Sequence, residues 1–356
     1  MTQENVKILR RFRRWGILTT LATIFLIWVG GWVRSTGSGM GCPDWPKCFD
    51  MWIPPTAEAQ LPPNYLEEYV KMRERKNQRV AKMLSGLGMT EMAEKIKNDP
   101  SVQEHEPFNA YKTWTEYVNR LIGVLVGFFI FLAFLFSIST RKIDKRIFRL
   151  SLAGFIGVAF EGWLGSIVVS TNLMPSIITV HMVIAMLILV VLIAAVIIAY
   201  TQESNISDLL YVKPMSKVWL GIGVSAVVLA QIIIGTQVRE EVDMVSKVLG
   251  EAERDQWIVN LGSIYSLHRT FYYVVAAAIM YWIWLLRGMR LFKDTTVKTV
   301  SILLLGILIV EIGLGIGMHR LGMPATFQPL HLLFGTLLFS ASFTLTGILY
   351  YKKILT

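Results

Sequence analysis

Two glutamates of this chain each precede a histidine by twenty residues, and the two pairs are themselves 150 residues apart. The first pair is Glu161 and His181, and the second is Glu311 and His331. Both lie in apolar sequence, where an ionisable side chain is costly and therefore indicates a function. The glutamates can carry protons or complete hydrogen bonds between helices, and we expect the second role. The repeat predicts a duplicated site.

A third pair of positions, Asn119 and His268, is 149 residues apart, so one copy has asparagine where the other has histidine. Asn119, His268, His181 and His331 all lie four or five residues inside apolar segments, about 7 Å deep at the helical rise. Facing side chains at equal depth in a four-helix bundle define a site in its core. We therefore predict that His268 and His331 bind a haem iron from opposite sides.

Two other interpretations of these histidines are available. Each could be a hydrogen-bonded residue of the helix core, which is the commoner role for a single histidine in a membrane helix. Zinc or copper would need a third protein ligand nearby, and none is evident at that depth. A matched pair within a repeat favours haem.

The two copies differ at a second position, because Glu116 corresponds to Tyr265. Glu116 lies one helical turn before Asn119, on the same helix face. The first copy thus has a carboxylate and one histidine, His181, and a haem held by one histidine keeps an open position suited to oxygen activation. The second copy, with His268 and a further histidine, would hold a saturated haem suited to electron transfer. We predict a reaction site and a redox site.

Four arginines lie near the ends of the apolar segments at the depth of these histidines. Guanidinium groups bind carboxylates through paired hydrogen bonds, so these residues are candidates for binding haem propionates. The alternative is that they only extend their charged ends to the membrane surface. The candidates are Arg34, Arg120, Arg239 and Arg269.

The chain has two cysteines, Cys42 and Cys48, separated by a proline-containing turn. In an oxidising compartment they most simply form a disulfide. A pair of reduced thiols is the alternative. Zinc is disfavoured because two further ligands are not evident.

The elements that position these residues are apolar. Of the 356 residues 54% are hydrophobic and 17% charged, against about a quarter charged in soluble proteins. A membrane span needs roughly 20 apolar residues. The sequence therefore predicts an all-α integral membrane protein in contact with lipid, with eight transmembrane helices at about 15–34, 115–139, 148–170, 176–200, 217–238, 264–286, 297–318 and 326–350.

Basic residues predict the orientation of these helices. The segments 7–14, 139–146, 287–293 and 351–353 are basic and fall on one side of an eight-helix topology, which is then the cytoplasm. Both termini are expected there, and the first helix is expected to be retained, not cleaved. The net charge of +10 indicates this topology, and no nucleic-acid partner is expected.

The repeat divides the chain into two tandem, pseudo-symmetric four-helix bundles, 1–205 and 206–356. The first helix of each aligns with an offset of 205, Gly30 with Gly235 and Arg34 with Arg239. The change of offset reflects an insertion at about 49–110 in the first bundle, rich in proline, lysine and glutamate, with a helix-like stretch near 65–97. We expect this insertion to lie outside the membrane on the non-cytoplasmic side.

Three runs of residues resemble the haem A synthase family. The run from Gly30 to Cys48 and the following Trp52-Ile-Pro-Pro55 resemble its first-span and first-loop signature, and Glu116-Tyr-Val-Asn-Arg120 resembles its second-span motif. His181, His268 and His331 fall where the family has its other haem-binding histidines. The resemblance covers nearly the whole chain except the insertion.

This resemblance implies an enzyme that oxidises the C8 methyl group of haem O to the formyl group of haem A, through a hydroxylated intermediate, for cytochrome oxidase assembly. The first half would hold the substrate haem, and the second half a haem b cofactor with its iron. Glu116 would be catalytic, and the cysteines would match the family's first-loop pair. Implied partners are haem O synthase and the oxidase assembly machinery, in a bacterial inner (plasma) membrane with the haem sites toward the non-cytoplasmic side. A homo-oligomer is compatible with this.

The chain departs from the family pattern at Asn119, which replaces a histidine and makes His181 the sole expected protein ligand of the substrate haem. The second half also has no cysteine pair. Two other function classes compete: a di-haem electron-transfer protein, which would need two histidines in each half, and a haem-carrying assembly factor. His105 and His319 have no counterparts, and surface roles are expected for both, with haem transfer as an alternative for His319.

Overall fold

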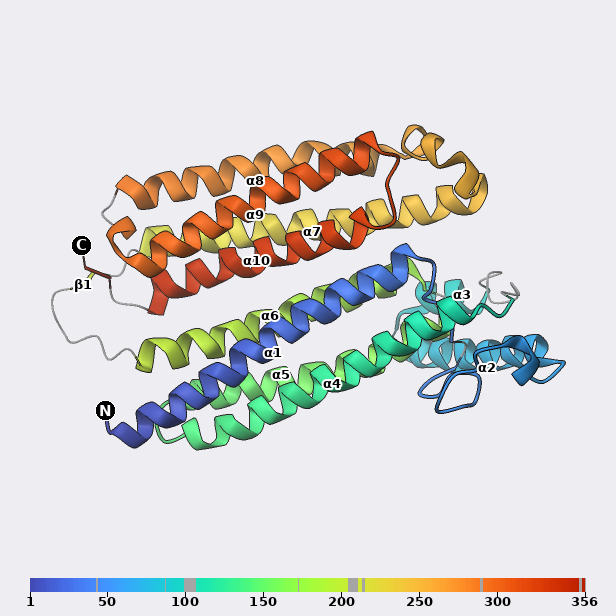
Figure 1. Ribbon diagram of the computed structural model, residues 1–356, viewed down its shortest axis with the longest axis horizontal. Helices are drawn as coiled ribbons and strands as arrows, with labels where there is room; N and C mark the ends of the chain where they lie inside the picture. Colours follow the sequence, from blue (N-terminus) through green and yellow to red (C-terminus); the bar gives the residue numbers. More distant parts are fainter. Residues whose placement is uncertain are drawn as a thin grey trace.

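The computed structural model describes residues 1–42, 44–86, 88–98, 107–171, 173–203, 211–212, 215–288, 291–351 and 354–355. Long helices run side by side, with both termini at one end of the molecule and the α2–α3 insertion at the other (Figure 1). We call the second end the disulfide end, because it also carries Cys42 and Cys48.

Within the described ranges, eight helices are long and apolar enough to cross a membrane, in agreement with the predicted number of spans. Most extend beyond the predicted limits, because the hydrogen-bonded helix continues past its apolar stretch until a cap ends it. They are α1 Gln3–Ser35, α4 Ala110–Thr140, α5 Lys145–Ser170, α6 Pro175–Glu203, α7 Met215–Leu249, α8 Ser263–Gly288, α9 Thr295–Arg320 and α10 Phe327–Tyr351.

Short polar side chains set where several of these helices begin. The carboxylate of Asp144 accepts the backbone N–H of Arg146 at the start of α5, and that of Asp294 accepts the N–H of Thr296 at the start of α9. Asn109 caps α4 in the same way. Such caps satisfy helix N–H groups that have no partner within the helix.

Apart from the helices of the insertion, the remaining described elements are short. The strands β1 Tyr211–Val212 and β2 Ile354–Leu355 form an antiparallel pair. Short segments of 3₁₀-helix are η1 Glu58–Gln60, η3 Glu251–Gln256, η4 Ile258–Asn260 and η5 Leu291–Lys293.

The helices pack as two groups that share one apolar core. Helices α1, α4, α5 and α6 contact one another, as do α7, α8, α9 and α10, and α10 also packs against α1 and α6. The approach is close at Gly31, where a Cβ atom would lie 2.9 Å from Leu332, and at Gly347, where it would lie 2.6 Å from Ile197. The predicted division at residues 205 and 206 falls outside the described residues and stays a prediction.

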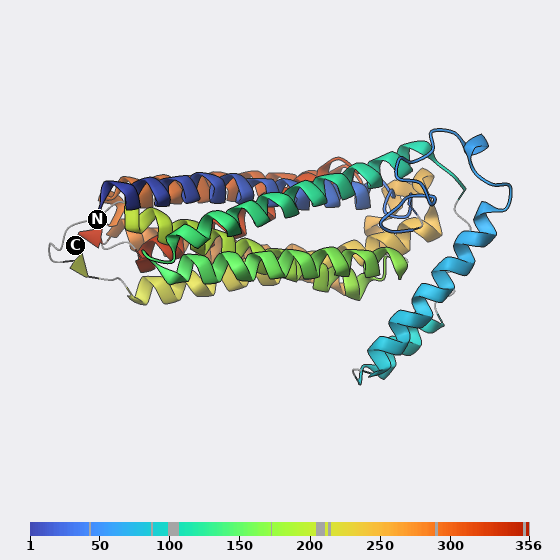
Figure 2. The same ribbon diagram turned by 90° about the horizontal axis from the view of Figure 1, so that it is seen from below.

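The insertion forms two helices, α2 Tyr65–Gly86 and α3 Thr90–Lys97, where the sequence predicted one helix-like stretch. Gly88 separates them with φ +81°, a conformation that favours glycine. Helix α2 runs obliquely back from the disulfide end (Figure 2). Ala81 and Ile96 of the hairpin pack with Ile167 of α5 and Ile177 of α6, so the insertion covers the ends of these two helices.

Candidate functional site

Each repeated glutamate lies directly beside its histidine. Nδ1 of His181 on α6 is 3.0 Å from Oε1 of Glu161 on α5, and Nδ1 of His331 on α10 is 3.1 Å from Oε1 of Glu311 on α9. A carboxylate at this nitrogen orients an imidazole and leaves Nε2 for a metal ion. These contacts join neighbouring helices, and a hydrogen-bonding role for the glutamates stays a prediction.

Glycines make room for the histidine rings. A Cβ atom at Gly165 would lie 3.6 Å from Cε1 of His181, and one at Gly315 would lie 3.5 Å from Cε1 of His331. The space is tighter at Gly235, where a Cβ atom would lie 3.2 Å from Cε1 of His268. Each imidazole therefore rests against bare backbone.

The second half brings His268 of α8 and His331 of α10 together, with ring centres 6.1 Å apart and ring planes at 82°. A metal ion bound at about 2 Å by a nitrogen of each ring would place the ring centres roughly 6 Å apart. Nδ1 of His268 is buried without a hydrogen-bond partner among the described residues. The pair therefore fits an iron held from two sides.

The wider donor set fits haem better than a bare metal ion. In the described part of the chain, no group of three or more His, Cys, Asp or Glu side chains is arranged to hold a metal. A porphyrin supplies four nitrogens of its own, so two imidazoles complete its coordination.

The first half has open space where the second half has an imidazole. Gly30 corresponds to Gly235, yet a Cβ atom at Gly30 would meet nothing within 4 Å. Oδ1 of Asn119, which corresponds to His268, is buried and has no hydrogen-bond partner among the residues described. Among the described residues of this half, His181 is the histidine available as a ligand.

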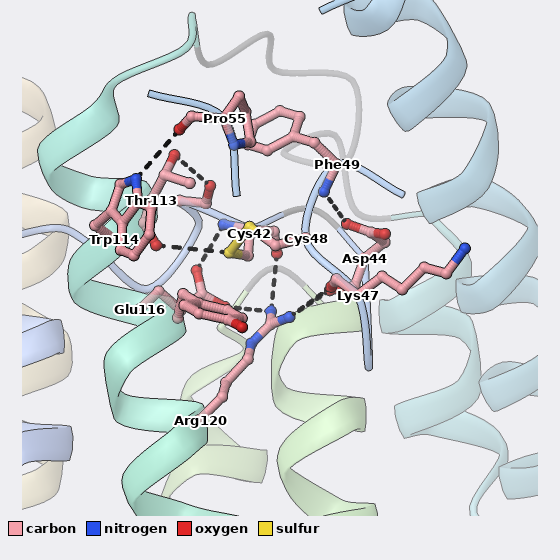
Figure 3. Close-up of a disulfide and its surroundings, with 12 residues drawn as sticks. Cys42, Asp44, Lys47, Cys48, Phe49, Pro55, Thr113, Trp114, Glu116 and Arg120 are labelled. Carbon is pink, nitrogen blue, oxygen red and sulfur yellow. Dashed lines mark hydrogen bonds and ion pairs between the residues drawn. A yellow bond between two sulfur atoms is a disulfide. The ribbon is translucent and has the colours of Figure 1, made fainter. Parts of the chain in front are cut away.

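Cys42 and Cys48 form a disulfide, as predicted, and Glu116 holds the start of this loop (Figure 3). Glu116 is 3% exposed, and its Oε2 accepts the backbone N–H of Cys42 at 2.8 Å. Its Oε1 pairs with Arg120 at 2.5 Å. The loop also approaches α4 at Gly41, where a Cβ atom would lie 2.5 Å from the backbone of Lys112.

The guanidinium of Arg120 completes the same loop. It donates to the carbonyl oxygens of Cys42 at 3.0 Å, Asp44 at 2.6 Å and Lys47 at 3.0 Å. The carboxylate of Asp44 in turn accepts the backbone N–H of Phe49. Arg120 and Glu116 therefore form a buried ion pair that shapes the loop over the first half, and a propionate contact for Arg120 stays a prediction.

Two other predicted arginines meet at a carboxylate that the sequence reasoning missed. Arg34 of α1 lies 2.8 Å from Oδ2 of Asp243, and Arg239 of α7 lies 2.5 Å from Oδ1 of the same residue. Arg239 also donates to Gln328 of α10. Arg269 is exposed. The spacing of Arg239 and Asp243, one helical turn apart, is a signal that could have identified the pair.

A family comparison identifies the scaffold. The model of COX15-CtaA, described as cytochrome oxidase assembly protein, matches residues 13–343. The chain belongs to the COX15-CtaA family. This confirms the resemblance stated from the sequence motifs, and with it an all-α membrane protein with a role in cytochrome oxidase assembly.

Similar proteins are named heme A synthase. The one from Shewanella oneidensis is 22% identical over 94% of this chain and 96% of its own length, and that from Nitrosomonas eutropha is 23% identical over 92% and 90%. The one from Bartonella quintana is 25% identical over 46% of this chain and 39% of its own. Two of these relatives are therefore matched along nearly their whole length.

In the second half of the chain, Tyr265 occupies the position that corresponds to Glu116, and it makes a different contact. The hydroxyl of Tyr265 lies 2.8 Å from Nδ1 of His319 near the end of α9. His319 is half-buried and engaged with Tyr265, whereas the sequence indicated an ordinary surface role. His105 lies outside the described residues.

Proposed function

We propose that the chain is a haem A synthase, an oxidoreductase that converts the C8 methyl group of haem O to the formyl group of haem A through a hydroxylated intermediate. Membership of the COX15-CtaA family and two nearly full-length relatives named heme A synthase support this. The change from methyl to formyl would remove four electrons from the methyl carbon attached to C8, two in each oxidation step, and it needs an external electron acceptor and a source of the formyl oxygen. The observation that carries the proposal is the difference between the two halves at corresponding positions.

The second half, 206–356, is proposed to hold haem b between His268 and His331. Their ring separation of 6.1 Å supports this, as do the ring spaces at Gly235 and Gly315. Glu311 would keep the proton on Nδ1 of His331 and leave Nε2 free. When bound, haem b would supply a redox centre that exchanges electrons with the substrate site.

The first half, 1–205, is proposed to bind haem O through His181, oriented by Glu161. The space beside Gly30 and the unpaired amide oxygen of Asn119 support an open face opposite His181. Such a face distinguishes a reaction site from a purely electron-carrying one. It also disfavours the di-haem electron-transfer alternative, which would need a second histidine here.

Glu116 is proposed to be required for turnover through the loop that it holds. Its two carboxylate oxygens contact Cys42 and Arg120, which supports a role in positioning the disulfide loop at the end of the first half. The disulfide closes the same loop, so Glu116, Arg120 and the cysteines would act as one unit.

The proposed setting is a bacterial inner (plasma) membrane, with the disulfide end and both haem sites toward the non-cytoplasmic side. The basic segments at the opposite end support this orientation. Haem O synthase is the proposed source of the substrate. Association of the chain with itself is compatible with the helical surface.

Expression of the chain in a host that makes haem O but not haem A tests the function. Extracted haems are separated by chromatography, and haem A or its hydroxylated precursor is expected. His181→Ala should abolish both products while haem b remains. Unchanged haem O alongside a normal content of haem b in the wild-type chain would refute the enzymatic proposal and favour an electron carrier or assembly factor.

A further inference from the structure

One segment of α7, from Gly235 to Asp243, contacts both halves of the molecule. Its first residue lies against the ring of His268. The hydroxyl of the next residue, Thr236, lies 3.0 Å from that of Thr179 on α6, and Gln237 donates to the same Thr179 at 3.1 Å. Thr179 lies on α6, the helix that carries His181, so the segment connects the His268 ring with the helix of the first candidate haem site.

The same segment joins the two corresponding arginines. Arg34 follows Gly30 by four residues, and Arg239 follows Gly235 by four. Each arginine therefore lies about one helical turn, or about 6 Å along the helix, beyond the corresponding glycine. Both guanidinium groups contact Asp243, and Arg239 also donates to the carbonyl oxygen of Arg34 at 3.3 Å. Arginines from both halves thus share one carboxylate.

The charges of this cluster do not balance, because two guanidinium groups face one carboxylate. Their side chains are largely buried, 18% exposed in Arg34 and 22% in Arg239, so solvent screens the cluster only in part. A haem propionate has the same carboxylate chemistry as Asp243 and would compete for the same guanidinium groups. Asp243 therefore occupies a carboxylate site that extends across the interface of the halves.

We propose that Asp243 is a positioning residue that couples the two haem sites through Arg34 and Arg239. The proposal rests on the proposed function, since it needs a haem in each half. A propionate that pairs with Arg34 in the first half displaces Asp243, whose charge then faces Arg239 alone. Added negative charge beside the second haem stabilises its oxidised form and lowers its midpoint potential. Such coupling is reciprocal between the two sites.

A redox titration of the haem b held by His268 and His331 tests this. The potential is measured in the purified full-length chain with and without zinc protoporphyrin IX, which carries two propionates but no redox-active iron. We expect the wild-type potential to fall when this porphyrin binds. The dimethyl ester of the same porphyrin has no carboxylates and should bind without a comparable fall.

Asp243→Asn should raise the potential of the haem b and abolish the fall caused by zinc protoporphyrin. Asp243→Glu keeps the carboxylate and should show the wild-type potential and the wild-type fall. Glu241→Gln is the matched control, because Glu241 lies on the same helix but accepts the backbone N–H of Gly262 instead. It should leave the porphyrin-induced fall intact.

An unchanged potential and an unchanged fall in Asp243→Asn would overturn the coupling. Porphyrin that binds the wild-type chain, by its own absorption, without lowering the potential would overturn it too, as would failure of zinc protoporphyrin to bind. The absence of any haem b from the wild-type chain would instead show that the proposed function itself is wrong.

Discussion

At the scale of single residues, the histidines of the second half differ in the groups that surround them. His268 and His331 rest on glycines and face each other, whereas His319 in the same half pairs with Tyr265. Ring contact with bare backbone leaves ring nitrogens for a metal ion, and a hydrogen bond to a hydroxyl uses one. Three histidines of one half are therefore not equivalent.

His268→Ala and His331→Ala should each abolish the low-spin spectrum of haem b in the purified chain, because an iron with one axial imidazole loses its sixth ligand. His319→Ala is the control and should keep the spectrum. Optical and electron paramagnetic resonance spectra check this. A retained low-spin signal in either of the first two variants would exclude that histidine as a ligand.

Gly235→Ala should lower haem b occupancy, since the new methyl group would lie 3.2 Å from Cε1 of His268 and displace the ring. Gly30→Ala makes the same chemical change at the corresponding position, where no atom lies within 4 Å, and should leave occupancy unchanged. The ratio of haem to protein is the measurement. Equal loss in both variants would point to a general folding defect.

At the scale of elements, the disulfide loop depends on α4. Glu116→Ala leaves the buried guanidinium of Arg120 without its carboxylate, and breaking a buried ion pair costs about 3 to 5 kcal/mol. We expect loss of haem A formation with haem b retained, because the described hydrogen bonds and ion pair of Glu116 all lie within the first half. Chromatography and the haem b spectrum check both results. Full activity in the variant would refute the role of the loop.

The start of α5 gives a pH-dependent prediction. Burial of Asp144 favours its neutral form, but hydrogen bonds and charge attraction from Arg146 outweigh this and hold its pKa below the ordinary 3.8. Because the pKa is lowered by folding, the stabilisation is present above pH 3.8 and lost as pH falls through the folded-state pKa.

Asp144→Ala should therefore lower the stability of the chain at pH 7 by about 1 kcal/mol, the usual value of a helix cap. The difference from wild type should shrink near pH 3, as measured by thermal unfolding in detergent. Asp144→Asn keeps the cap but not the charge and should fall between the two. A difference independent of pH would assign the effect to the cap alone.

At the scale of the whole molecule, the two halves share a four-helix scaffold and differ at the candidate sites, where Glu116 and Asn119 correspond to Tyr265 and His268. The largest apolar cluster includes Ile24 of α1 and Met186 of α6 together with Trp282 of α8 and Leu345 of α10. Changes in one half can therefore reach the other through packed side chains as well as through Asp243.

Asn119→His would make the first half resemble the second. The space beside Gly30 leaves room for the new imidazole, so the bound substrate haem should gain a second protein ligand, show an additional low-spin signal and turn over at a changed rate. Asn119→Gln lacks an imidazole and should give no such signal. Spectra of the substrate-loaded chain decide this, and unchanged turnover in Asn119→His would show that the open face is not needed.

The sequence alone indicated the eight spans, the repeat and the cysteine pair, because hydropathy and spacing are local properties of the chain. It identified His181, His268 and His331 for the same reason. It could not establish that Glu161 and Glu311 lie against their histidines, since that depends on how neighbouring helices are rotated.

Only the tertiary structure brought Arg34 to Asp243, 209 residues further along the chain. It also turned Glu116 toward Cys42 and Arg120, where the motif indicated only a carboxylate beside the substrate site. Sequence patterns specify which residues share the depth of a membrane helix. Which of them meet is decided by helix packing, because close approach at small residues such as Gly31 determines which faces come into contact.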